Sequence, residues 1–76
     1  MTLRLITPET LSEHQAEAVF LPGAAGAFEV LRGHAPIISA LAAGELRWRG
    51  VSGEESLHLD GGMAMVENDI ITVCTK

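Results

Sequence analysis

Short runs of alternating residues, each closed by a turn signal, most limit what this chain can fold into. In Glu45–Arg49, Leu46 and Trp48 alternate with three charged residues, the pattern of a strand with one buried and one solvated face. We count about eight such short strands, at the regular spacing of an all-β sandwich or barrel. They are predicted at Thr2–Ile6, Glu13–Leu21, Gly26–Leu31, Pro36–Ala43, Glu45–Arg49, Glu55–Asp60, Met63–Val66 and Ile70–Val73.

Two of these runs are less regular than the others. Glu13–Leu21 alternates, but its alanines also suit a helix, so both structures remain open there. Pro36–Ala43 is apolar with no clean period, and its length favours a buried strand over a helix.

Glycine and proline mark the turns. Pro22 presets φ for the second position of a type II turn, which requires positive φ at Gly23. No lysine and no helix start follow the glycines as a phosphate-binding loop requires, so we interpret them as turn and bend residues. Further signals of this kind are Gly33, Gly44, Gly50–Gly53, Gly61, Gly62 and Asn68–Asp69.

The length of 76 residues indicates one domain, residues 1–76, with little core to spare. A partner surface that adds burial is therefore physically plausible. The single Cys74 cannot form an internal disulfide and no signal-like apolar stretch opens the chain, which favours a reducing, cytosolic compartment. No apolar run approaches the roughly 20 residues of a membrane span.

Charge and composition argue against several functions. The net charge is −5, the five basic residues form no cluster, and only two Phe and one Trp are aromatic. This argues against a nucleic-acid-binding surface. His14, His34, His58 and Cys74 lack metal-ligand spacing, so no metal site and no cofactor are predicted. Met63 and Met65 are interpreted as packing residues, and no catalytic constellation is apparent.

Three motifs lead to a known family. They are LPG-x-x-G-x-F-x-VL-x-x-HAP at residues 21–36, L-x-x-G at 41–44 and GG-x-x-x-V at 61–66. In order and spacing they resemble the N-terminal β-sandwich of the epsilon subunit of rotary F-type ATP synthase, called delta in mitochondria. The resemblance runs from about Leu3 to Val73.

The resemblance implies a flattened β-sandwich of two five-stranded sheets, about ten short strands in all. It also implies a non-catalytic central-stalk, or rotor, subunit that docks on the gamma subunit and the c-subunit ring. Such a subunit helps couple proton or sodium translocation to ATP synthesis. It would sit peripherally on the cytoplasmic side of the bacterial inner membrane.

Two groups of residues are implied as contacts. The gamma-facing candidates are His34, Ala35, Pro36 and Ser39, and the c-ring-facing candidates are Gly26, Ala27, Phe28 and Glu29. His34 has a structural alternative, in which one ring nitrogen ties the turn at Gly33 to nearby backbone. Where some members place an acidic residue, this chain has Ala27; Glu29 is the nearest acid, on the face opposite Phe28.

Longer family members carry a C-terminal helical hairpin that inhibits the enzyme and, in some, contributes to an ATP site. This sequence ends at Lys76, so we expect neither helix-based inhibition nor ATP binding. It leaves open whether that end is natural.

Two alternatives lie outside this family. One is a lipoyl- or biotinyl-type carrier domain, which needs a lysine displayed on a central hairpin, whereas the only lysine here is Lys76. The other is a small barrel that binds oligonucleotides or oligosaccharides, for which this chain lacks stacking aromatics.

Overall fold

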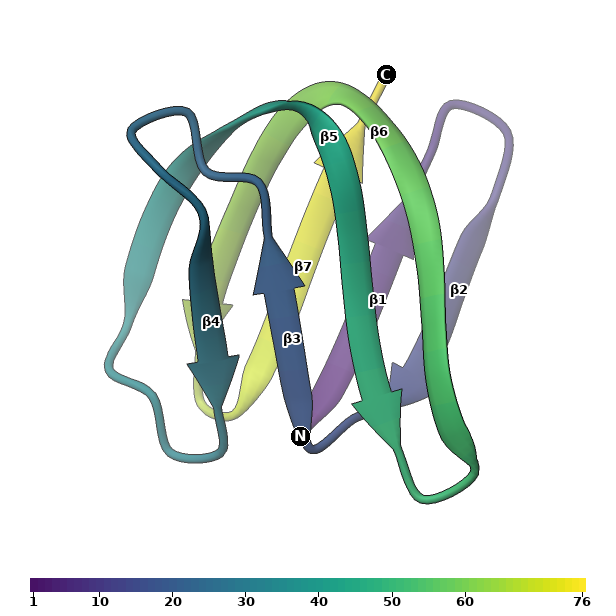
Figure 1. Cartoon of the computed structure of the whole chain (residues 1–76), viewed down its shortest axis with the longest axis vertical. Coiled ribbons are helices and arrows are strands. Elements are labelled where there is room, and N and C mark those ends of the chain that lie inside the picture. Colours follow the sequence, from purple (N-terminus) through teal and green to yellow (C-terminus); the bar gives the residue numbers. More distant parts are fainter.

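The computed structural model describes residues 1–76 and contains seven strands and no helix. All seven strands belong to one sheet in the order β2-β1-β7-β6-β5-β3-β4, in which only the β1–β7 pair is parallel. The all-β prediction is confirmed, but two separate sheets and about ten strands are not. The strands are β1 Thr2–Ile6, β2 Leu11–Gln15, β3 Ala18–Leu21, β4 Phe28–Leu31, β5 Ile37–Gly50, β6 Gly53–Glu67 and β7 Ile70–Thr75 (Figure 1).

The long strands β5 and β6 fold this sheet into two layers. On β5, strand β3 pairs with Arg47–Arg49 alone, near the end of that strand. On β6, strand β7 pairs with Gly62–Glu67 alone, again near the end of that strand. Figure 1 shows β5 and β6 arching over the top of the molecule, with β3 and β4 in front and β7, β1 and β2 behind. We call these the front layer and the back layer; each contains one half of β5 and of β6.

Three glycines predicted to end strands instead lie inside them. Gly44 is within β5, and Gly61 and Gly62 are within β6 with φ of 103° and 145°. Pairing between β5 and β6 continues on both sides of these positions, so the glycines bend the ribbon without ending it. A Cβ at Gly44 would lie 2.9 Å from the Cβ of Pro22, which shows how closely the bend packs against the β3–β4 loop.

The type II turn predicted at Pro22–Gly23 is wrong, because Gly23 does not have positive φ. After β3 the chain stays extended beside β5, where Ala42 N donates to Pro22 O and Ala24 N donates to Ala40 O. The chain reverses between Gly23 and Gly26, where Gly26 has φ of 140° and its N–H donates to Gly23 O. Gly23 is required for space, since a Cβ there would collide with the carbonyl oxygen of Gly26.

Two strand predictions also need correction. Glu13–Leu21 is divided, because the amides of Ala16 and Glu17 bond to Met1 O and Arg49 O where the chain passes from β2 to β3. Pro36–Ala43 is not a buried strand. Its residues from Ile37 onward form the first half of β5 with alternate residues outside, and Ile38 is 72% exposed.

The core lies between the two layers. Leu3, Leu5, Ile71 and Val73 from β1 and β7 belong to the same buried cluster as Val19, Leu21 and Val30 from β3 and β4. The predicted inward positions of Leu46 and Trp48 are confirmed, with 0% and 6% exposure. Each such side chain contributes about 1.5–3 kcal/mol by leaving water. The loop predicted at Gly50–Gly53 is present as a turn at Val51–Ser52, and the turn predicted at Asn68–Asp69 is also present.

Candidate interaction surfaces

An apolar surface covers the outside of the back layer. Cross-strand pairs place Ile38 beside Met65, and Met63 between Ala40 and Cys74, which in turn neighbours Ile6. Ile38, Met63 and Met65 are 72%, 47% and 46% exposed. We define this apolar outer face by Ile6, Leu11, Ile38, Met63, Met65 and Cys74. Charged residues border it: Glu67 lines one hollow with Ile38 and Met65. Arg4, paired with Glu13 at 3.2 Å, lines another hollow with Met65, toward the β2 edge.

Met63 and Met65 therefore do not have the packing role predicted for them. Their neighbours Ala64 and Val66 point into the core with 1% and 2% exposure, so alternation sends the methionines outward. Adjacent apolar side chains on an open sheet face are typical of an interaction site, and exposed methionines adapt to varied partner surfaces.

Of the four predicted gamma-facing residues, Pro36 borders this face. Ala35 and Pro36 are exposed, and Pro36 lines a cavity of about 350 Å³ together with Ile38 and Met65. Ser39 is half-buried on the opposite side of β5 from Ile38, and its hydroxyl donates to Ala40 O. Only part of the predicted group therefore adjoins the apolar outer face.

His34 makes the structural contact considered for it. Its Nδ1 donates to the carbonyl oxygen of Ala35 at 2.7 Å. Its backbone N–H closes the preceding turn on Leu31 O at 3.1 Å. Both bonds hold the bend that leads into β5.

Asp69 ties this bend to the opposite end of the chain. One carboxylate oxygen accepts from Gly33 N at 3.2 Å, and the other lies 3.8 Å from the N-terminal amine. The carbonyl of Asp69 also accepts from Thr2 N. The β6–β7 turn thus orients the segment that precedes Pro36.

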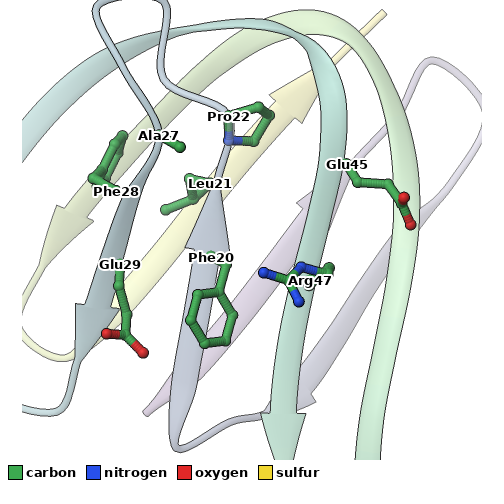
Figure 2. A pocket seen from close by; sticks show the side chains of 8 residues that line it. All are labelled: Phe20, Leu21, Pro22, Ala27, Phe28, Glu29, Glu45 and Arg47. Carbon is green, nitrogen blue, oxygen red and sulfur yellow. The ribbon is translucent and has the colours of Figure 1, made fainter.

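Three of the four predicted c-ring-facing residues line a second hollow, on the front layer. Ala27, Phe28 and Glu29 border an open cavity of about 320 Å³. Figure 2 shows these side chains with those from β3 and β5 around the same hollow. The full lining is Phe20, Leu21, Pro22, Ala27, Phe28, Glu29, Glu45 and Arg47.

Charge is unevenly placed in this hollow. The Arg47 guanidinium lies 4.8 Å from the centre of the Phe20 ring and 3.5 Å from a carboxylate oxygen of Glu54. Glu29 and Glu45 line the same hollow and form no ion pair. Glu29 therefore supplies an exposed acid next to Ala27, while Gly26 is exposed in the turn.

The structure contains no group of three or more His, Cys, Asp or Glu side chains placed to hold a metal ion. No helix is long and apolar enough to cross a membrane.

A family model for the β-sandwich domain of the ATP synthase delta/epsilon chain matches residues 1–76. The chain belongs to this family. The resemblance inferred from the three motifs is thereby confirmed, and a carrier or ligand-binding module unrelated to ATP synthase is excluded.

Curated delta/epsilon relatives agree. The ATP synthase epsilon chain of Rhodopirellula baltica is 44% identical over 72 residues, which are 93% of this chain and 56% of the relative. That of a Cyanothece species is 43% identical over 76 residues, 96% of this chain and 54% of the relative. The chain thus spans about half the length of the curated relatives it matches.

Solved structures show the same fold. A chain in the mitochondrial ATP synthase of Euglena gracilis matches with a TM-score of 0.88 at 23% identity, covering 96% of this chain and 48% of that one. A chain in the central stalk and c-ring structure from Tetrahymena thermophila gives 0.79 at 15% identity, covering 97% and 61%.

The apolar outer face was the part of the surface that the motifs did not identify. Its signals were present in the sequence: Ile38 and Ala40 alternate with Ser39 and Leu41, and the two methionines are two residues apart. Both patterns are also typical of buried strands, so the exposed side had to come from the fold.

Proposed function

We propose that this chain is a non-catalytic rotor component of an F-type ATP synthase. It docks on the gamma subunit and the c ring and helps couple proton or sodium translocation to ATP synthesis. The structural relative from Tetrahymena comes from a central stalk with its c-ring, which supports this placement. In a bacterium the complex would hold the chain peripherally on the cytoplasmic side of the inner membrane.

The apolar outer face is the observation that carries the proposal. A domain with so small a core gains stability by covering Ile38, Met63 and Met65 with another protein. Gamma is the occupant we assign to this face, because the predicted gamma-facing Pro36 borders its hollow. The hollow at Ala27–Glu29 is left for the c ring.

Co-expression with gamma followed by gel filtration tests the docking. The unchanged chain should co-elute with gamma at micromolar concentration. Met65→Glu should elute separately while remaining folded, because it places a charge in the apolar contact and its side chain is already 46% exposed.

Val51→Glu is the matched control. Val51 is 98% exposed at the tip of the β5–β6 hairpin, far from the apolar outer face along β6, so this variant should still co-elute. Separate elution of the unchanged chain from gamma would refute the docking; co-elution of Met65→Glu would refute the assigned face.

A further inference from the structure

The first half of β5 is a sheet edge without a neighbouring strand. Over residues 37–40, β5 forms a strand ladder with β6 on one side only (Figure 1), whereas Leu41 already forms a bridge with Gly23 on the other side. On its other side Ala40 O and Ala42 N bond to the β3–β4 loop. Backbone N–H and C=O groups alternate in direction along a strand. The N–H and C=O of Ile38 therefore point to the same open side as those of Ala40 and Ala42.

The backbone of Ile38 has no partner there. None of the hydrogen bonds outside the strand ladders involves its N–H or its C=O, and the N–H of Ala40 is likewise unbonded. The N–H and C=O of Ile38 and the N–H of Ala40 therefore form a short row of unbonded backbone groups. The row ends where Ala24 N bonds to Ala40 O. Such a row is a template for one more strand.

The Ile37–Ala40 edge has no charged side chain, whereas the other free edges of the sheet carry acidic residues. Glu13 stands on the free edge strand β2, and Glu29 on β4. The first half of β6, which pairs with β5 but has no strand on its other side, carries Glu54, Glu55 and Asp60. Charged side chains on edge strands oppose pairing with other chains. Ile37–Ala40 carries none.

We infer that an extended segment of gamma adds to the Ile37–Ala40 edge as a further strand of the back layer. This inference rests on the proposed docking to gamma. The side chain of Ile38 lies on the apolar outer face beside Met65, so alternate side chains of the added segment continue that face. The segment is therefore uncharged and apolar at the positions that flank Ile38.

Amide hydrogen exchange on the free chain and on its complex with gamma tests the added strand. The amides of Ile38 and Ala40 should exchange freely in the isolated chain and about 100-fold more slowly in the complex. A complex in which the Ile38 amide exchanges as fast as in the free chain would overturn the inference and leave the docking intact. Protection of Ile38 in the free chain that grows with its concentration would also overturn it, because a second copy would then occupy the edge.

Substitution gives an independent measurement. Ile38→Pro removes the outward N–H without removing a bond to β6, so affinity for gamma should fall about 10-fold or more. Ile38→Val keeps the N–H and a β-branched side chain and should bind like the unchanged chain. Equal affinity of the proline variant would contradict strand addition, and absence of any complex would refute the docking and this inference together.

Discussion

At the scale of single residues, glycine is required for two different reasons: a positive φ, and a lack of space for a Cβ. Gly62 lies inside β6, has φ of 145°, and has no room for a Cβ, which would collide with the carbonyl oxygen of Cys74. Gly26 has a similar φ of 140° with no atom within 4 Å of a Cβ. A side chain at Gly26 would therefore suffer backbone strain alone, whereas one at Gly62 would suffer both backbone strain and steric crowding.

This difference predicts unequal effects of alanine. Gly26→Ala should lower the free energy of unfolding by about 1 kcal/mol through backbone strain alone. Gly62→Ala should lower it by about 3 kcal/mol or more, because the β7 backbone must also shift. Urea denaturation of both variants measures this, and equal losses would mean that Gly62 is not crowded by β7.

The side chain of Asp69 is a second residue with an identifiable role. Asp69→Gly keeps the positive φ of 62° accessible but releases the N–H of Gly33, so the Gly33 amide should exchange faster and stability should fall by about 1 kcal/mol. Asp69→Asn retains the acceptor and tolerates this φ, so exchange at Gly33 should stay slow. Unchanged exchange in Asp69→Gly would show that the hydrogen bond does not restrain the bend.

At the scale of elements, alternation predicts most of the strands but not how far each strand extends. Alternation with charged residues predicts that Leu46 and Trp48 point inward, and both are buried. Gly44 and Gly61–Gly62 looked like strand ends because glycine weakens a strand locally. The β5–β6 ladder on both sides of the bend outweighs that weakness, and this pairing is non-local.

The candidate surfaces were also only partly predictable from the sequence. The motifs located the segments around Ala27 and Pro36, and both line hollows. Ile38, Met63 and Met65 were not identified as surface residues, because their exposure depends on which side of the folded sheet faces the core.

At the scale of the whole molecule, the two layers present different surfaces. The back layer carries the apolar outer face, and the front layer carries a hollow bordered by Glu29 and Glu45. A rotor component that contacts two partners at once needs two such surfaces. We assign the first to gamma and the second to the c ring.

The c-ring assignment predicts the effect of reversing a charge. Glu29→Lys should fold normally, because Glu29 is exposed and forms no ion pair, but should impair coupled ATP synthesis by the assembled enzyme. Glu55→Lys, an exposed charge reversal near the β5–β6 turn, is the control and should leave synthesis unchanged. Normal synthesis with Glu29→Lys would place Glu29 outside the contact.

The most direct test of the account is the reactivity of Cys74, the only cysteine of the chain, exposed on the apolar outer face between Met63 and Ile6. Maleimide labelling is measured on the free chain and on its complex with a cysteine-free gamma. A Val51→Cys, Cys74→Ser variant serves as the control, because its thiol lies at the uncovered hairpin tip. We predict that Cys74 reacts readily in the free chain and is protected in the complex, while the control thiol reacts equally in both; equal labelling of Cys74 in the free chain and in a verified complex would contradict docking through this face.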